Sequence, residues 1–136
     1  MLVIDTGPLV AAFDSRDRVH RSCVDLLETA AGPLLVPEVA LSEVAYLVGA
    51  QVGPIAEAKL AAALRDRELQ AVATEPGDWP RIAELVERYI DLPLGVVDAT
   101  VVAIAERLSV STLATLDRRH FAVVRPRHID GFELVP

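Results

Sequence analysis

Cysteine is nearly absent from this sequence of 136 residues, because Cys23 is the only one. A single cysteine excludes an intrachain disulfide and a cysteine-rich zinc site, and it fits a reducing compartment. No apolar run has the length of a membrane span, and residues 1–13 lack the basic leader of a secretory signal. We therefore expect a cytoplasmic protein without a membrane segment.

The signs of disorder and of repeated architecture are absent as well. Apolar residues make up 52% of the chain and charged residues only 24%, so the chain can bury a large core. No internal repeat, low-complexity tract or linker interrupts the sequence. The length suits one compact unit, and we predict a single domain over residues 1–136.

Lysine occurs only once, as Lys59, so nearly all of the positive charge is carried by arginine. The net charge of −7 argues against a nucleic-acid partner, but the charges are unevenly placed. Residues 38–106 contain twelve acids and five bases, whereas residues 118–128 contain four arginines, two histidines and no acid. A second basic group lies at residues 16–21. Arginine suits bidentate phosphate contacts, although a GC-rich genome also favours arginine over lysine.

Hydrophobic spacing predicts short strands that alternate with helices. The expected strands are residues 2–5, 33–37, 69–74, 112–117, 122–124 and 132–135. A helix is expected to start at Thr6, and further helices are expected at 19–30, 38–48, 54–67, 79–90 and 96–108. The last of these is apolar on nearly all sides, so we expect it at the centre. This alternation predicts an α/β fold with a mainly parallel sheet covered on both faces.

Two of the expected strands end in an aspartate, Asp5 and Asp117. In open parallel sheets, ligands bind just beyond the carboxyl ends of the strands. We therefore expect both carboxylates at one edge of the sheet, in a shared site. Helix capping is the alternative for each of them, because aspartate is a favoured N-cap residue.

Two further acids lie among the apolar residues of expected helices. Glu43 has Val39 and Leu47 one turn away on either side, which places it on the apolar stripe of its helix. Asp98 follows Val97 in an apolar run, where an unpaired carboxylate carries a desolvation penalty of several kcal/mol. The alternatives are a Glu43 that reaches water at the edge of the stripe, and an Asp98 that is stabilised by the N-terminus of its helix.

If these four acids converge, each close pair repels by about 4 kcal/mol at ~4 Å and an effective dielectric constant of about 20. A hard divalent cation such as Mg²⁺ or Mn²⁺ removes the conflict, since it takes oxygen ligands from carboxylates and water. Such a centre can direct a water against a phosphodiester and neutralise the leaving oxygen. The pattern therefore favours a metal site in which Asp5 is a ligand.

Two hydroxyl groups accompany the strand-end acids. Thr6 follows Asp5, and Thr115 lies two residues before Asp117, on the same face of the expected strand. We expect both hydroxyls to hydrogen-bond within the site, unless Thr115 is an ordinary buried strand residue.

Four segments resemble, in order and spacing, the acidic motifs of PIN-domain ribonucleases, and most closely those of the VapC toxins of bacterial toxin–antitoxin pairs. The segments are VIDTGPLVAAFD, VPEVALSEVAYLV, LPLGVVDATVVAIAERL and TLATLDRRHF. The resemblance implies an α/β/α sandwich and RNA cleavage that depends on Mg²⁺ or Mn²⁺. It implies Asp5 and Asp98 as the most direct metal ligands, with Glu43 and Asp117 completing the site, often through water. It also implies a homodimer and a small VapB-type antitoxin whose C-terminal tail occupies the acidic groove.

The resemblance gives the basic groups a use, because they flank the expected acidic site and can hold RNA phosphates. The candidate RNA-binding residues are Arg16, Arg18, Arg21, Arg118, Arg119 and His120. A solvated basic surface without such a role is the alternative.

Other functions have to be weighed against RNA cleavage. A PIN-like module that binds RNA or protein without turnover fits the same residues, and so does a PIN nuclease of RNA processing outside a toxin–antitoxin pair. The intact set of four acids favours catalysis. A phosphoryl-transfer enzyme of the haloacid-dehalogenase kind is disfavoured, because Gly7 stands where a second aspartate is needed. A receiver domain is disfavoured because the only lysine, Lys59, lies in mid-chain.

Overall fold

The computed structural model describes all residues from 1 to 136 and has a five-stranded sheet at its centre. All neighbouring strands are parallel, in the order β3-β2-β1-β4-β5. The strands are β1 Leu2–Ile4, β2 Leu34–Pro37, β3 Gln70–Val72, β4 Thr112–Ala114 and β5 Glu133–Val135. Val3 of β1 pairs with Leu35 on one side and with Leu113 on the other, so β1 is the middle strand. The predicted parallel sheet is confirmed.

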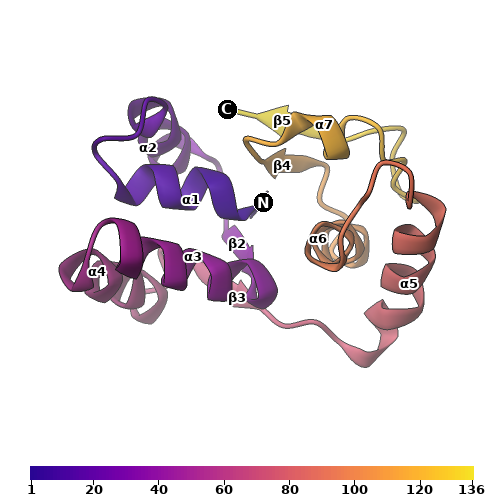
Figure 1. Ribbon diagram of the computed structural model, residues 1–136, viewed down its shortest axis with the longest axis horizontal. Coiled ribbons are helices and arrows are strands. Elements are labelled where there is room, and N and C mark those ends of the chain that lie inside the picture. The colour runs from indigo at the N-terminus through magenta and orange to yellow at the C-terminus, as the bar shows by residue number, and fades with distance from the viewer.

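Helices cover both faces of this sheet (Figure 1). The helices are α1 Thr6–Phe13, α2 His20–Thr29, α3 Glu38–Gln51, α4 Pro54–Arg65, α5 Trp79–Arg88, α6 Val96–Arg107 and α7 Arg118–Phe121, and a short 3₁₀ turn, η1 Pro76–Asp78, precedes α5. Leu2 and Ile4 pack with α1, α3 and α4, whereas Val3 points to the opposite face and packs with α5 and α6. Because successive strand residues alternate between faces, two cores form, and the predicted α/β/α sandwich is confirmed.

Helix α6 lies at the centre of the molecule, as its apolar sequence predicted. All of its residues from Ala99 to Ala105 are buried, and the helix contacts α5, α3 and β2. It begins after Gly95, in the loop that leads from α5 to the sheet edge where β1 ends. The position of α6 therefore brings its first turn, with Asp98, next to the strand that ends at Asp5. None of the helices combines the length and the apolar character needed to cross a membrane.

The predicted strand at residues 122–124 is wrong, because these residues form a turn that closes α7. The backbone N–H groups of this segment donate to carbonyls of α7, so the chain is still coiling there. Phe121 and Val124 are both buried, whereas Val123 is exposed, and this spacing of three residues fits a helical turn. A short apolar run cannot distinguish the two-residue period of a strand from the 3.6-residue period of a helix. Helix α7 itself was not predicted.

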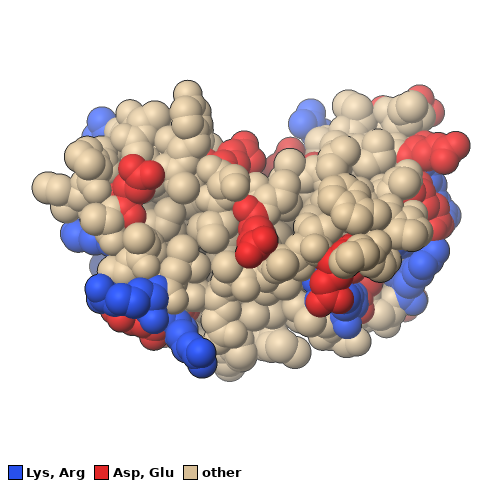
Figure 2. Space-filling model, turned by 90° about the horizontal axis from the view of Figure 1, so that it is seen from below, with Lys and Arg blue, Asp and Glu red and all other residues tan.

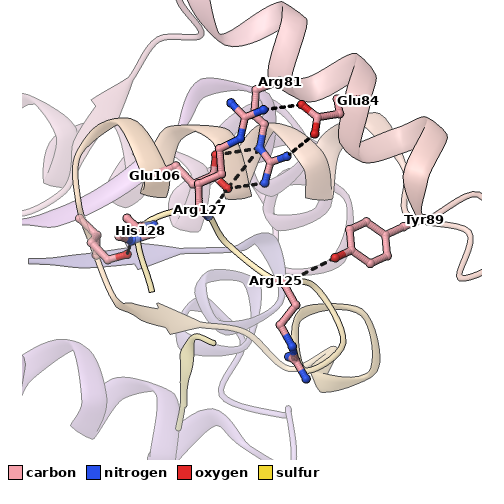
Figure 3. A network of polar contacts seen from close by, with 8 residues as sticks. Arg81, Glu84, Tyr89, Glu106, Arg125, Arg127 and His128 are labelled. Carbon is pink, nitrogen blue, oxygen red and sulfur yellow. Dashed lines mark hydrogen bonds and ion pairs between the residues drawn. The ribbon is translucent and has the colours of Figure 1, made fainter. Parts of the chain in front are cut away.

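A network of charged side chains joins α5 and α6 to the segment before β5 (Figure 3). Arg81 of α5 is only 8% exposed, and its guanidinium donates to both carboxylate oxygens of Glu106 on α6, at 2.8 and 2.9 Å. Glu84 accepts hydrogen bonds from Arg81 and Arg127, and Glu106 also accepts one from the backbone N–H of Arg127, at 3.0 Å. The two carboxylates thus fix the C-terminal segment to the helical layer.

Candidate functional site

A cleft of about 480 Å³ opens where β1 and β4 end. Its polar lining residues are Asp5, Thr6, Glu43, Asp98, Asp117 and His120. These residues come from the β1–α1 junction, from α3, from the first turn of α6 and from the start of α7 (Figure 1). The four acids that the sequence singled out therefore line one cleft, although they belong to four separate parts of the chain.

Asp5 is the most buried of the four acids, with 9% of its surface exposed. Its Oδ2 atom accepts a hydrogen bond of 3.0 Å from the hydroxyl of Thr115, and its side chain makes no capping bond to α1. Burial raises the pKa of the Asp5 carboxyl above its usual value of 3.8. Hydrogen bonds from Thr6 and Thr115 lower this pKa in part, while the negative charges of Asp98 and Glu43 raise it further.

Glu43 lies on the exposed rim of the cleft, and its predicted place on the apolar stripe of α3 is wrong. The buried line of α3 runs through Ala40, Val44 and Val48, and Glu43 is rotated from that line by one residue, or about 100°. Its Oε2 atom accepts a hydrogen bond of 3.1 Å from the hydroxyl of Thr6. The Thr6 hydroxyl thus ties Glu43 to the β1–α1 junction, one residue from Asp5.

Asp98 pairs with a histidine from another helix. The Nδ1 atom of His120 lies 2.7 Å from Oδ2 of Asp98, and the two side chains are 12% and 23% exposed. Asp98 makes no capping hydrogen bond, although it lies in the first turn of α6. Asp98 therefore has a direct side-chain partner in His120, in addition to the N-terminus of α6 that was the alternative suggested by the sequence.

Asp117 is exposed and lies beyond the end of β4, because this strand stops at Ala114 and not at residue 117 as predicted. The backbone N–H of Asp117 donates to the hydroxyl oxygen of Thr115, at 3.1 Å, and the side chain makes no capping bond to α7. The buried Thr115 hydroxyl therefore bridges Asp5 and the backbone of Asp117. The residue directly after β4 thus sets the relative positions of two of the acids.

The donor set of the cleft fits a hard divalent cation. Its acids and threonines supply oxygen atoms, which such cations prefer, and the buried Asp5 has no cationic partner. In this arrangement no three histidine, cysteine, aspartate or glutamate side chains are grouped closely enough to hold a metal ion together. The carboxylates would therefore have to move closer together, away from the positions fixed by their present hydrogen bonds, when a cation binds.

The arginines proposed for RNA binding lie outside the cleft, and most of them have partners. Arg16 pairs with Asp14 at 3.0 Å, Arg21 with Asp25 at 2.9 Å, and Arg119 with Asp117 at 3.8 Å, while Arg118 donates to the carbonyl of Pro136 and Arg18 has no ion pair. Among the six candidates only His120 lines the cleft. On the face shown in Figure 2, acidic side chains flank a notch between two lobes, and the larger basic groups lie toward the sides.

One wall of the cleft was missed by the sequence analysis. It is formed by Pro93 and Gly95 of the loop before α6 and by Val96 and Val97 at the start of that helix, and Val96 is 50% exposed. These residues could have been predicted to line the site from their position in the sequence, because they directly precede Asp98.

Substitution of Asp5 by asparagine is expected to raise the thermal midpoint in metal-free buffer at pH 7 by a few degrees. The pKa of Asp5 is raised in the folded protein, so its contribution to stability is fully present below pH 3.8 and is lost as pH rises through the folded pKa. Asparagine resembles the protonated acid and avoids that loss. The measurement is calorimetry in EDTA at pH 4 and pH 7, and the gain should be larger at pH 7.

The exposed Glu87, substituted by glutamine, serves as the control for this experiment. A lower midpoint for Asp5→Asn would show instead that the charge of Asp5 stabilises the fold. For Asp98→Asn the gain should be smaller, because loss of the charged partner of His120 offsets the relief of repulsion.

The family model that matches the chain is the PIN domain, over residues 2–125. The chain is 31% identical over 135 residues to Ribonuclease VapC26 of Mycobacterium tuberculosis (strain ATCC 25618 / H37Rv), which covers 99% of this chain and 100% of that protein. This similarity extends beyond the quoted motifs to nearly the whole length of both proteins.

Solved structures with the same fold are less similar in sequence. The crystal structure of VapC20 from Mycobacterium tuberculosis, described as a toxin that cleaves the sarcin–ricin loop, has a TM-score of 0.80 at 17% identity, covering 96% of this chain and 99% of that one. FitAcB from Neisseria gonorrhoeae has a TM-score of 0.72 at 13% identity, covering 100% and 97%. VapBC2 from Rickettsia felis, bound to a fragment of promoter DNA, has a TM-score of 0.68 at 15% identity, covering 98% and 96%. With its acidic cleft, its parallel sheet and its full-length relative, this chain belongs to the PIN domain family and, within it, to the VapC ribonucleases.

Proposed function

We propose that this chain is a metal-dependent endoribonuclease that forms one domain over residues 1–136 and acts in the cytoplasm as the toxin of a type II toxin–antitoxin pair. The observation that carries the proposal is the convergence of four acids from four parts of the chain on one cleft. Full-length similarity to Ribonuclease VapC26 and the fold shared with the toxin VapC20 support it.

The four acids divide into an inner and an outer pair. Asp5 and Asp98 are the less exposed and would hold Mg²⁺ or Mn²⁺ most directly, while the exposed Glu43 and Asp117 would complete the site, in part through water. A cation bound there would polarise the scissile phosphate and make an attacking water a better nucleophile. The rim position of Glu43 and Asp117 lets these two carboxylates orient that water and receive its proton.

Hydrogen bonds from threonines hold the acids ready for this role. The Thr115 hydroxyl donates to Asp5 and accepts from the N–H of Asp117, and the Thr6 hydroxyl donates to Glu43. The bonds to Asp5 and Glu43 restrict the rotation of two carboxylates whose charges are repelled by their neighbours, and the bond from Asp117 fixes the backbone that carries the third. Partners of this kind reduce the reorganisation that is needed when the site binds a cation and substrate.

Removal of the divalent cation is expected to abolish RNA cleavage. The test uses purified protein and ribosomal RNA transcribed in vitro, with Mg²⁺, with Mn²⁺ and with EDTA. We expect discrete cleavage products with either metal, none in EDTA, and recovery when metal is added back in excess. Cleavage that continues at the same rate in EDTA would contradict the metal-dependent mechanism, and intact RNA under every condition would favour a binding module without turnover.

We also propose that the basic residues beside the cleft hold RNA phosphates, which the net charge of −7 would otherwise repel. The group contains Arg16, Arg18, Arg21, Arg118, Arg119 and His120. Arg118 and Arg119 are the best placed of the arginines, because α7 carries them next to His120 and Asp117 at the cleft.

Reversal of both charges in the double variant Arg118→Glu/Arg119→Glu is expected to weaken RNA binding by about tenfold or more. Each lost phosphate contact also lowers the slope of log affinity against log salt by about 0.7 for single-stranded RNA. The measurement is fluorescence anisotropy with a labelled RNA in EDTA, across a range of salt. The control is Lys59→Glu/Arg65→Glu on α4, which changes the net charge equally away from the cleft. An unchanged salt slope would indicate a merely solvated basic surface.

A homodimer and a small VapB-type antitoxin are part of the same proposal. FitAcB and VapBC2 share the fold of this chain at nearly full coverage, which supports a partner of this class. A search for a short reading frame next to the gene, followed by its co-expression and a cleavage assay of the purified complex, separates a toxin from a nuclease of RNA processing. A toxin is inhibited by that neighbour, whereas a processing nuclease has no such inhibitor.

A further inference from the structure

The hydrogen bond between Asp98 and His120 differs from the other contacts of the cleft. Its length of 2.7 Å is at the short end for a bond from nitrogen to a carboxylate oxygen. The His120 side chain is only 12% exposed, which is much less than the 77% of its neighbour Arg119. A histidine that serves mainly as a phosphate contact would present its ring to solvent, and this one is turned inward.

Each of the other carboxylate partners in the cleft has a recognisable task. Thr115 holds Asp5, and Thr6 holds Glu43. Asp98 receives no hydroxyl, and the imidazole of His120 is the one side chain that bonds to it. His120 therefore holds Asp98 as Thr115 holds Asp5 and as Thr6 holds Glu43, although it comes from a different helix.

The local fold holds His120 in place. It lies in α7, a helix of four residues that is anchored by Phe121, of which only 1% is exposed. The backbone carbonyl of His120 accepts hydrogen bonds from the N–H groups of Val123 and Val124, and Val124 is itself fully buried. The imidazole is thus carried by a fixed backbone turn, and because a carboxylate only accepts, its Nδ1–H must donate to Asp98.

We propose that His120 is a positioning residue for Asp98. The Nδ1–H group holds Oδ2 of Asp98 and leaves the second oxygen of that carboxylate without a hydrogen-bond partner, free to bind a divalent cation together with Asp5. The inference rests on the proposed metal-dependent function. In this role His120 holds a carboxylate of the acidic site in place, whereas the sequence had suggested that His120 contacts RNA. Loss of such a partner typically weakens metal affinity or activity by about 10- to 100-fold.

The test compares three variants, His120→Asn, His120→Gln and His120→Ala. The amide nitrogen of asparagine can take the place of Nδ1, whereas that of glutamine takes the place of Nε2, so only asparagine can restore the bond to Asp98. Mn²⁺ titrations without RNA, followed by electron paramagnetic resonance, measure the affinity directly. We expect the alanine and glutamine variants to bind Mn²⁺ about 10- to 100-fold more weakly than wild type, and the asparagine variant to stay within a few-fold of it.

Cleavage kinetics on the same variants supply a second readout. A positioning role lowers kcat and leaves KM nearly unchanged, whereas a phosphate contact raises KM and flattens the salt dependence of RNA binding. Arg125→Ala, at an exposed position after α7 whose side chain contacts none of the four acids, is the control and should keep wild-type Mn²⁺ affinity. Comparison of the asparagine and glutamine variants, with circular dichroism to verify folding, keeps the test decisive even if the alanine variant unfolds.

The outcomes separate this inference from the proposed function. If wild type binds Mn²⁺ and all three variants bind it equally well, the positioning role is overturned while the metal-dependent function stands. If the asparagine variant is as impaired as the glutamine variant, the bond through Nδ1 is not what matters, and the inference is overturned too. If wild type binds no Mn²⁺ and cleaves no RNA, the proposed function fails, and the positioning role fails with it.

Discussion

The Asp98→Asn variant is expected to cleave RNA about 10³-fold more slowly than wild type at saturating Mg²⁺. Asparagine keeps the size of the side chain and one oxygen but removes the negative charge, and charge stabilisation by a bound metal contributes several kcal/mol to the transition state. At 1.36 kcal/mol for each factor of ten, a loss of about 4 kcal/mol gives this reduction. Asp5→Asn should have a similar effect, because both acids lie on the inner side of the cleft.

The measurement is single-turnover cleavage of one defined RNA, with circular dichroism to verify folding. Glu87→Gln makes the same chemical change on the exposed face of α5 and should retain wild-type rates. Equal rates for Asp98→Asn and wild type would mean that the cleavage arises from a contaminant or from another part of the surface. The variants at Glu43 and Asp117 should lose less activity, because these rim acids are proposed to act in part through water.

Removal of one partner from the buried Arg81–Glu106 pair is expected to have the largest effect on stability. In Arg81→Met, the carboxylate of Glu106, with 10% of its side chain exposed, loses three hydrogen bonds and its counter-charge. Loss of one member of a buried pair typically destabilises a protein by about 3–5 kcal/mol. The same hydrogen bonds to Glu106 raise the pKa of Arg81 above its usual value, so its guanidinium stays charged.

Urea denaturation measures this free energy of unfolding. The double variant Arg81→Met/Glu106→Leu should recover much of the loss, since replacement of a whole buried pair by apolar groups is often nearly neutral. The control is Arg65→Met, whose partner Asp66 lies in water, and its effect should be far smaller. If Arg81→Met unfolds at the urea concentration of wild type, the network in Figure 3 contributes little to stability.

The fold could be predicted largely from hydrophobic periodicity, because short apolar strands alternate regularly with helices of up to 14 residues. The middle strand at Leu2–Ile4 and the apolar helix α6 were both recognised in this way. The segment at 122–124 could not be, because three apolar residues fit a strand and a helical turn equally well. The helical turn forms at this segment because Phe121 and Val124 are both buried in the core that also contains residues of α5 and α6, and such burial is a tertiary property.

The candidate site was predictable in its acids and less so in their partners. Asp5 and Asp98 stood out because carboxylates are rare in apolar runs, and that signal is local. Glu43 was placed wrongly on its helix, since the neighbours at three and four residues were apolar without being equally buried. The bond between Asp98 and His120 joins residues on different helices, and no spacing in the sequence indicates it. The buried pair of Arg81 and Glu106 escaped notice for the same reason.

The most direct test of the central claim is the position of Mn²⁺ in crystals of the protein, located by its anomalous scattering. We expect a peak inside the cleft, within coordination distance of carboxylate oxygens of both Asp5 and Asp98, and its loss in crystals of Asp98→Asn. A peak elsewhere on the surface, or a cleft without any peak at saturating Mn²⁺, would contradict the claim that these acids form a metal-dependent nuclease site.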